Sequence, residues 1–518
     1  MTSHQLRAND RFEVEWDDEA TAAARWILDR EHNHGTLKRF EIEKAVSTDE
    51  IAMATDTVVV NGRIYSGTPT MPAPPREMRG LHYSEMWDGT YRAESIAQTE
   101  AALTRDHDAL SDVELANELS RDLERSGAGQ RATMSPVFKI FVQSHPFSVF
   151  CRAEFGDPDG LLLQYRMLQG HETETTDAAL GLERLAELAG SSGELATALE
   201  NGQIDAARPN PDHGQFFGQL DEYLARYGWR GSIWSDLSTP TWAENPAAPL
   251  AMVARYIHNP ETRPSVALAA ATADREAAIT EAMRRLDDDD KRTTLQAFID
   301  EHEPFARVRE GRAHWQLVLS GMLRRPLIEL GRRFVEQDLL DDPEDVLHLV
   351  SGEIQALARQ EIDGRSLVAQ HRADYEHWRT LEAPDFIGAG DAGPDPLAAL
   401  NQPAVVERVS ADGKLHSGIP ASSGIAYGRA RVVTELADAM MIEPGEILVC
   451  RTTAPPWTPV FALASAVVTE GGTILAHSAI VAREYKIPAV LSIDHATTLI
   501  PEGAMITVDG DRGTVLLD

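Results

Sequence analysis

The stretch that decides the fold of the C-terminal part is ASAVVTEGGTILAHSAIVAREY, residues 464–485. An apolar run at 466–468 is typical of a buried strand, Gly471 and Gly472 follow it, and a helix is expected to begin near His477. Glycines let backbone N–H groups approach a ligand, and a helix N-terminus presents unpaired N–H groups, so this junction favours anions. A neutral imidazole there is a nucleophile beside a phosphate site, which predicts that His477 carries a phosphoryl group.

Strand-like runs surround this junction. They are IAYGRARVVTE at 425–435, GEILVCRTT at 445–453, IPAVLS at 487–492 and MITVDGDRGTVLLD at 505–518. Together with the helix they predict a compact α/β domain at residues 414–518. Asp509 and Asp511 flank a glycine, but no further acidic ligands follow at calcium-loop spacing, so a plain turn is expected.

The chain upstream is expected to form one substrate module in two parts. In residues 1–80, the stretch ATAAARWILDREH at 20–32 has a helical pattern, and Asn61-Gly62 predicts a type I′ hairpin turn. Residues 81–383 have mainly helical spacing and are expected to form a large helical, substrate-binding domain.

Two helix starts and one linker organise this region. Leu182, Leu185 and Leu188 share a helix face, and Thr176 or Asp177 is expected to open that helix. Asp342 followed by Pro343 marks a second start. Residues 384–413 are rich in Gly, Ala, Pro and Asp, which predicts a flexible hinge that lets the last domain travel.

Composition excludes several classes of protein. The 518 residues carry a formal charge of -34, which disfavours a nucleic-acid partner because like charges repel. Two cysteines, Cys151 and Cys450, are too few for a disulfide framework or a structural zinc site. No stretch is apolar enough for a membrane span and no signal peptide is visible, so a cytoplasmic location is expected.

The motif TEGGTILAHSAIVAREYKIPAV, residues 469–490, resembles the signature of the mobile phosphohistidine domain shared by phosphoenolpyruvate synthase, pyruvate phosphate dikinase and rifampin phosphotransferase. GIPASSGIAYGRARVV, PGEILVCRTTAPPWTPVF and VDGDRGTVLL also resemble strands of that domain. The resemblance covers residues 414–518 and implies a swivelling β/β/α domain in which His477 is the phosphorylated residue. Thr473 stands where the family usually has a second glycine, and Ala476 replaces the usual Ser or Thr before the histidine.

The upstream region is similar to the substrate module of rifampin phosphotransferase and of phenylphosphate synthase. The resemblance rests on residues 161–189, 223–246 and 308–354. It implies transfer to the hydroxyl of a small organic, for example phenolic, substrate. The family often has an Arg-Glu pair with a nearby base in this region, which favours Arg309 and Arg312 of REGRAHW as phosphate-binding residues. They are three residues apart and share a helix face, although a solvated face would look the same.

Other residues carry weaker expectations. Gly472, Thr473 and Ser478 are candidate phosphate-binding residues beside His477, and Ser478 could instead cap the helix. Arg230 is a further candidate, although burial against acids is the simpler expectation. His32 and His34 lack a third metal ligand, residues 287–290 are expected to be a solvated loop, and no metal site is expected on this chain. The remaining candidates for an aromatic pocket are Trp229, Trp234, Trp242 and Trp315, which are more often core residues.

The preferred hypothesis is a phosphotransferase component that carries a phosphoryl group on His477. Family members load this histidine with an ATP-grasp domain, and neither that domain nor a GxxxxGK[ST] loop is visible here, so a separate ATP-grasp subunit that holds ATP and Mg²⁺ is expected. One alternative is loading from phosphoenolpyruvate by a separate barrel subunit. Another is a noncatalytic binding or regulatory protein with a retained carrier fold. Replacing His477 by Ala is expected to cost at most about 1 kcal/mol if its side chain is not a buried anchor.

Overall fold

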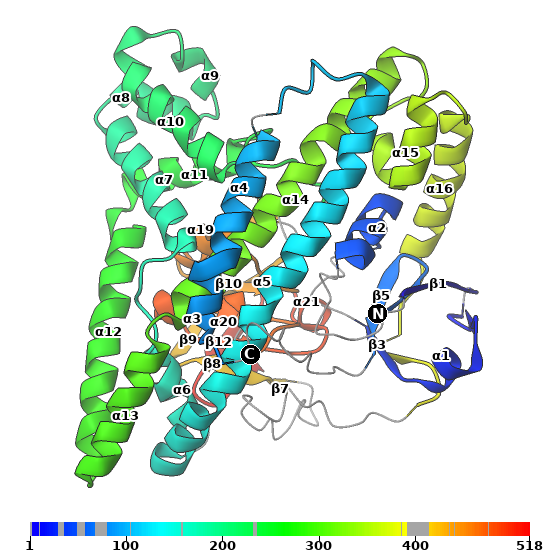
Figure 1. Cartoon of the computed structure of the whole chain (residues 1–518). Helices are drawn as coiled ribbons and strands as arrows, with labels where there is room; N and C mark the ends of the chain where they lie inside the picture. The colour runs from blue at the N-terminus through cyan, green and yellow to red at the C-terminus, as the bar shows by residue number, and fades with distance from the viewer. Residues whose placement is uncertain are drawn as a thin grey trace. The chain divides into compact units, whose positions relative to one another are not determined.

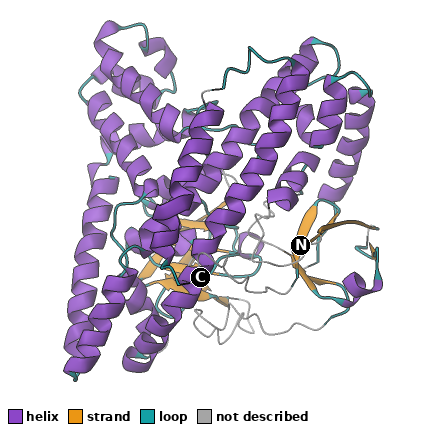
Figure 2. Cartoon of the chain, in the orientation of Figure 1, coloured by secondary structure: helices purple, strands orange, loops and turns teal. Residues whose placement is uncertain are grey.

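The structure is a computed structural model. It describes residues 3–9, 11–28, 36–48, 57–67, 80–103, 105–156, 159–231, 236–384, 386–390, 414–434, 436–439, 441–474 and 476–518. Helices dominate these residues, and a sheet domain lies at the C-terminal end of the chain (Figures 1 and 2). None of the helices in these ranges combines the length and the apolar character needed to cross a bilayer.

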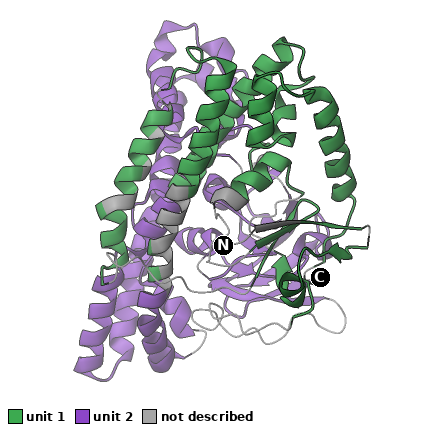
Figure 3. Ribbon diagram, turned by 45° about the vertical axis from the view of Figure 1, so that its right-hand side comes forward, with its two compact units in different colours: residues 1–139, 234–239, 315–399 green, residues 140–233, 240–314, 400–518 purple. Residues whose placement is uncertain are grey.

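The chain divides into two compact units that do not follow its linear order (Figure 3). Unit 1 holds residues 1–139, 234–239 and 315–399, and unit 2 holds residues 140–233, 240–314 and 400–518. Two long helices contribute to both, namely α5 (Asp112–Phe155) and α14 (Phe305–Glu336). The domain limits predicted from the sequence are a different division and stay predictions.

In unit 1, the described residues form a six-stranded sheet in the order β2-β1-β4-β5-β3-β6. Its strands are β1 (Ser3–Ala8), β2 (Val14–Glu15), β3 (Trp26–Leu28), β4 (Thr57–Val60), β5 (Arg63–Ser66) and β6 (Phe386–Ile387). The predicted hairpin is confirmed, because β4 and β5 pair antiparallel and both loop residues have positive φ, 46° at Asn61 and 71° at Gly62.

The helix expected at residues 20–32 is wrong over most of its length. Helix α1 (Glu19–Ala23) ends after five residues, and Trp26 then begins strand β3, which pairs with β5 and β6. The Trp26 ring is buried in the core of this sheet, and its indole N–H donates to the carbonyl of Thr21 at 2.8 Å. Tertiary pairing therefore overrides the alanine-rich local pattern.

The N-terminal end of the predicted hinge also needs correction. Phe386 and Ile387 form strand β6, whose pairing with β3 buries Ile387. The amides of Ala389 and Gly390 donate to the carbonyls of Ala22 and Ala24. A regular element thus occupies the start of the segment, and residues 391–413 of the predicted hinge lie outside the described residues.

Helices build the rest of unit 1. They include α2 (Arg39–Thr48), α3 (Tyr83–Met86), the π-helix η2 (Trp87–Tyr91), α4 (Arg92–Leu103), α15 (Ser351–Ala358) and α16 (Gly364–Arg379). Their main core contains Phe40, Leu119, Leu327 and Phe334. Asp342 is an N-cap, as expected, but it opens the short 3₁₀ helix η5 (Pro343–His348), and α15 begins separately.

The helical part of unit 2 holds the C-terminal end of α5, the start of α14 and a series of shorter helices. These are α6 (Asp159–Arg166), α7 (Glu174–Gly190), α8 (Gly193–Glu200), α9 (Ile204–Ala207), η3 (Pro211–His213), α10 (Gly214–Tyr227), α11 (Ala247–His258), η4 (Pro260–Thr262), α12 (Pro264–Arg285) and α13 (Asp289–His302). The expected N-cap at Thr176 or Asp177 is wrong. Thr173 caps α7, and the Thr176 hydroxyl accepts a hydrogen bond from the Thr173 amide in return.

The C-terminal sheet of unit 2 confirms the strand-like runs seen in the sequence. Its described strands are β7 (Leu415–Ser417), β8 (Ile419–Ser422), β9 (Ile425–Val433), β10 (Ile447–Cys450), β11 (Ala466–Thr469), β12 (Ala489–Leu491), β13 (Met505–Asp509) and β14 (Thr514–Leu517). They form one sheet in the order β7-β14-β13-β9-β10-β11-β12-β8, in which β9 to β12 run parallel.

Among its described residues, this domain also has the short helices α18 (Leu436–Ala439), η6 (Pro455–Trp457), α19 (Thr458–Phe461) and α21 (Ala496–Leu499). The longer helix α20 (His477–Glu484) packs against β8, β11 and β12. Strand β11 lies between the parallel strands β10 and β12, and the loop that follows its carboxyl end leads into α20.

Candidate active site

The loop between β11 and α20 has the shape expected from its glycines. Gly472 has φ 114°, a conformation that side chains with a Cβ rarely adopt, and its carbonyl accepts a hydrogen bond from the Ser492 hydroxyl at 2.6 Å. Helix α20 begins at His477, as predicted. Its N-cap is Ala476, which makes no side-chain cap, so the capping role considered for Ser478 is wrong.

The candidate phosphate-binding residues of this loop lie close to one another. A Cβ added at Gly472 would be 3.5 Å from the Ser478 hydroxyl, and the carbonyl of Thr473 accepts the amide of Ala476 at 2.9 Å. Ser478 is buried. The structure therefore gathers Gly472, Thr473 and Ser478 at the start of α20, and their phosphate-binding role stays a prediction.

The ring of His477 is buried and contacted at both nitrogens. Its Nδ1 lies 3.2 Å from Oε2 of Glu310, and its Nε2 lies 3.4 Å from Oγ1 of Thr458. The His477 and Glu310 side chains are only 3% and 2% exposed. The ring of Phe461 lies at 79° to the imidazole, with the ring centroids 6.4 Å apart. The histidine is thus enclosed by two oxygens and one aromatic ring.

Glu310 lies in the first turns of α14 and accepts a second hydrogen bond, from the Thr175 hydroxyl at 3.1 Å. Burial by itself raises the pKa of the Glu310 carboxyl. The charge and hydrogen bond of His477, together with the charge of Arg309, outweigh that effect and lower the pKa below its ordinary value. The Glu310 carboxylate accepts a hydrogen bond from Nδ1–H of His477, and in the tautomer with its proton on Nδ1 the lone pair lies on Nε2.

The two arginines predicted for phosphate binding do lie in one helix. Arg309 is half-buried beside Glu310, and Arg312 is buried one turn of α14 further on. The charge of Arg309 acts on the Glu310 carboxyl, which brings Arg309 to the site. A phosphate-binding role stays a prediction for both residues.

Arg230 is fully buried, and the charges of the Glu310 and Glu174 carboxylates act on its guanidinium. Its Nη2 donates to Nδ1 of His314 at 2.9 Å and to the carbonyl of Glu174 at 3.3 Å. The guanidinium also lies 5.8 Å from the ring of Trp242. Burial, followed by the charge of Arg230, holds the pKa of His314 well below its ordinary value, so this histidine is neutral.

The remaining residues singled out from the sequence occupy ordinary structural positions or lie outside the described residues. Trp242 is a core residue, Trp229 donates its indole N–H to the Ala225 carbonyl, and Trp315 is half-buried. Trp234, His32 and His34 fall outside the described residues. Asp288 caps α13, and Asp509 accepts the amides of Asp511 and Arg512, as in an ordinary turn.

Across the residues that the structure describes, no three His, Cys, Asp or Glu side chains gather as a metal would require. The ATP and Mg²⁺ expected at a partner's nucleotide site stay a prediction.

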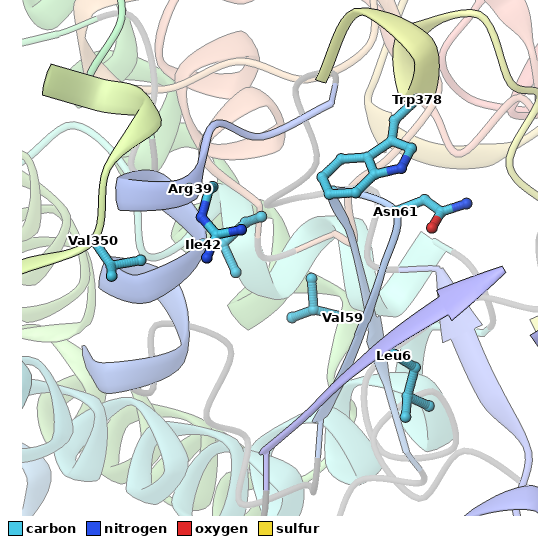
Figure 4. Close-up of a pocket in the computed structure, with 8 residues that line it drawn as sticks. Leu6, Arg39, Ile42, Val59, Asn61, Val350 and Trp378 are labelled. Carbon is cyan, nitrogen blue, oxygen red and sulfur yellow. The ribbon is translucent and has the colours of Figure 1, made fainter. Parts of the chain in front are cut away.

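Two cavities lie elsewhere in the described residues. One of about 40 Å³ in unit 1 is lined by Leu6, Arg39, Ile42, Val59, Asn61, Gly62, Val350 and Trp378 (Figure 4). The other, of about 550 Å³, is an open groove between α7 and α12 in unit 2. Neither includes His477 or Glu310 in its lining.

Both residues of the His477–Glu310 contact lie in segments that match known protein families. Residues 442–513 match the mobile domain of PEP-utilising enzymes, and residues 134–310 match the fourth domain of rifampicin phosphotransferase. The chain carries domains of the PEP-utilising superfamily. His477 lies in the first match and Glu310 is the last residue of the second.

Curated relatives agree with this family. The chain is 28% identical to the uncharacterised phosphotransferase YvkC of Bacillus subtilis, over 68% of this chain and 43% of that protein. It is 28% identical to rifampicin phosphotransferase of Bacillus cereus, over 57% of this chain and 34% of the relative. It is 31% identical to the prodigiosin synthesizing transferase PigC of Serratia marcescens, over 66% and 39% respectively. The chain spans less than half the length of each of these relatives.

Sequence reasoning missed Glu310 and Thr458 as neighbours of His477, and Thr175 as a hydrogen-bond donor to Glu310. Glu310 had a signal, because it follows Arg309 and completes the Arg-Glu pair that the family resemblance implies. Thr175 and Thr458 had none, since a threonine near a helix start is ordinary. Only the packing of α7 and α19 places their hydroxyls at the site.

Proposed function

We propose that this chain is a phosphotransferase component in which His477 carries a phosphoryl group and passes it to the hydroxyl of a small organic substrate, phenolic or otherwise. The contact between His477 and Glu310 is the observation that carries the proposal. It joins the nucleophile of a mobile-domain sequence to a buried, ionised carboxylate in the domain that matches rifampicin phosphotransferase. The matched families supply the reaction class.

Loading of the histidine begins at Nε2. Its lone pair attacks the phosphorus of the donor, the new N–P bond forms, and the bond from phosphorus to the donor's leaving group breaks. Nδ1 keeps its proton throughout. We propose that the donor is ATP, bound with Mg²⁺ on an ATP-grasp module that residues 1–518 do not supply, and that the swivelling of residues 414–518 brings His477 to it.

Transfer of the phosphoryl group to the acceptor hydroxyl takes place with His477 in contact with Glu310. With Glu310 at Nδ1, the phosphorylated ring retains its Nδ1 proton, so the leaving group is a neutral imidazole rather than an imidazolate. The carboxylate also fixes the ring plane, which aims the N–P bond. Arg309 lies beside Glu310 and supplies positive charge for the phosphoryl oxygens. The docked pair therefore makes the phosphohistidine reactive next to the substrate module.

The experiment is chemical phosphorylation of the full chain. Phosphoramidate, a small phosphoryl donor, should label one histidine, and peptide mapping under alkaline conditions should find acid-labile phosphate on the peptide that contains His477. The label should vanish in His477→Asn and persist in His495→Asn, which removes an exposed histidine of the same domain. Label that survives in His477→Asn on this peptide contradicts the proposal.

ATP tests the source of the phosphoryl group. The chain incubated alone with β-labelled or γ-labelled ATP should gain no label, and addition of an ATP-grasp module should load His477. Stoichiometric label on the chain alone would exclude the need for a separate donor module.

A further inference from the structure

We infer that Thr458 is a catalytic residue whose hydroxyl holds the phosphoryl group on Nε2 of His477; this rests on the proposed function. Its Oγ1 lies 3.4 Å from Nε2, and the side chain is buried. No other hydrogen-bonding contact to Nε2 is present among the described residues. Thr458 is therefore the polar group that faces the reacting nitrogen.

The two ring nitrogens have different roles. The Glu310 carboxylate accepts a hydrogen bond from Nδ1–H, and Nε2 keeps the lone pair that accepts from the Thr458 hydroxyl. When the N–P bond forms, that lone pair is consumed and the hydroxyl loses its acceptor. The oxygens of the new phosphoryl group then lie on the same side of the ring, and they are charged acceptors. A buried hydroxyl gains more from a charged acceptor than from a neutral one.

The backbone around Thr458 suits a positioning task. Thr458 begins α19 directly after the 3₁₀ helix η6, and Pro455, Pro456 and Pro459 restrict φ on both sides of it. Phe461 lies three residues further on, and its ring forms a T-shaped pair with the same imidazole. One short, stiff helical segment thus contributes both the hydroxyl and the aromatic wall.

Thr458 and Glu310 differ in where they act. Thr458 lies in the same domain as His477, residues 414–518, whereas Glu310 stands on α14. If the domain swivels, Thr458 travels with the histidine and contacts the phosphoryl group during loading and transfer. Glu310 meets the ring only at the substrate module. Loss of the Thr458 hydroxyl should therefore slow loading even from a small donor in solution.

Phosphoramidate again provides the probe. The Nε2 lone pair forms the N–P bond, the bond between phosphorus and the donor nitrogen breaks, and ammonia leaves with that electron pair and takes up a proton. The phosphorylation rate of His477 in the full chain is measured for wild type, Thr458→Val and Thr458→Ser. Thr458→Val keeps the shape without the hydroxyl and should load about 10-fold to 100-fold more slowly. Thr458→Ser keeps the hydroxyl and should stay within about threefold of wild type.

Thr453→Val is the matched control. Thr453 is buried on the same segment and its hydroxyl has no hydrogen-bond partner among the described residues, so its loss should leave the rate unchanged. Circular dichroism of each variant checks folding, and Thr458→Ala replaces the valine variant if that one does not fold. A folded Thr458→Val or Thr458→Ala that loads at the wild-type rate overturns the inference.

A second measurement needs no variant. Digestion of the phosphorylated wild-type chain should release Nε2-phosphohistidine, and the Nδ1 isomer would overturn the assignment of Thr458. If the phosphoryl label does not depend on His477, the proposed function itself is wrong. If labelling requires His477 but its rate is unchanged by loss of the Thr458 hydroxyl, only this inference is wrong.

Discussion

His477 and Glu310 are 167 positions apart in the chain, yet their side chains meet at 3.2 Å and are both buried. A carboxylate without a counter-charge is costly to bury, and Glu310 is held by His477, by the Thr175 hydroxyl and by the charge of Arg309. The geometry of the pair is similar to that of catalytic histidines that an acid orients through the nitrogen away from the reaction. Both residues are therefore expected to contribute to stability, and under the proposed function they also serve the chemistry.

Replacement of Glu310 by Gln should prolong the life of the phosphohistidine. The amide keeps the size of the side chain but loses the charge that retains the Nδ1 proton, so the imidazole becomes a poorer leaving group. At pH 8 we expect hydrolysis of phospho-His477 to slow by about tenfold, since a charge-assisted hydrogen bond is lost. The measurement is decay of acid-labile phosphate after phosphoramidate loading. Glu301→Gln, an exposed change on α13, is the control, and equal decay in both variants would contradict the role of Glu310.

Replacement of His477 by Ala should also destabilise the fold more than its position at a helix start suggests. The ring is enclosed, and its loss leaves a cavity beside Phe461 and removes a hydrogen-bond partner of Glu310. The expected cost is about 1–3 kcal/mol in the free energy of unfolding, above the 1 kcal/mol expected for an exposed side chain. Urea unfolding measures it, with His495→Asn as the exposed counterpart. A cost near zero would mean that the ring is not buried in solution.

The loop from β11 to α20 depends on one backbone conformation. At Gly472, φ is 114°, and an added Cβ would lie 3.1 Å from the Cβ of Ala476. Gly472→Ala should therefore cost about 1–3 kcal/mol in stability and reduce phosphorylation of His477, because the loop that presents the ring must shift. Gly218→Ala in α10 meets no neighbouring atoms and should instead stabilise by about 0.5–1 kcal/mol. Thermal unfolding compares the two, and a harmless Gly472→Ala would show that the loop conformation is not required.

Helix α20 also buries a carboxyl group at its other end. Glu484 is 4% exposed, its Oε1 has no hydrogen-bond partner among the described residues, and burial raises its pKa to about 8. The folded state thus holds a proton that the unfolded state releases at its lower pKa. The stability that this proton supports is complete below the unfolded pKa of about 4.3 and is lost as the pH rises through about 8.

Glu484→Gln should test this titration. The neutral amide avoids burial of a charge, so the variant should gain on the order of 2–4 kcal/mol relative to wild type between pH 5 and pH 9. Urea unfolding at pH 5, 7 and 9 measures the difference. Glu301→Gln should show no comparable pH dependence because that side chain is exposed. A constant difference across this range would exclude a raised pKa at Glu484.

At the scale of the whole chain, the predicted swivelling of the C-terminal domain depends on the segment that connects it to the residues before it. The composition of residues 391–413 still predicts a flexible connection, while β6 shows that the segment before Gly390 is part of the unit 1 sheet. Limited proteolysis should cut between 391 and 413 first and release a fragment of roughly 12 kDa. Cleavage at 384–390 should be slower because those residues are paired. Equal resistance of 391–413 and the strands would count against a swivelling domain.

The order of elements around His477 followed from local signals in the sequence. Apolar runs, paired glycines and a helical pattern act over a few residues, and so do the Asn61-Gly62 turn and the Asp342 cap, which is why these expectations hold in the structure. Helical spacing likewise indicated the large helical region, because a period of 3.6 residues is a property of neighbours in the chain.

Tertiary structure decided what these elements contact. Trp26–Leu28 became a strand because β5 and β6 pair with it, although its alanine-rich surroundings favour a helix. Phe386 and Ile387 joined the same sheet from more than 350 positions away, out of a segment that looked like pure linker. Glu310 and Thr458 reach the two nitrogens of His477 from separate helices, at separations of 167 and 19 residues. Local propensity carries no information on such contacts, since their free energy arises from burial and pairing that exist only once the chain has packed.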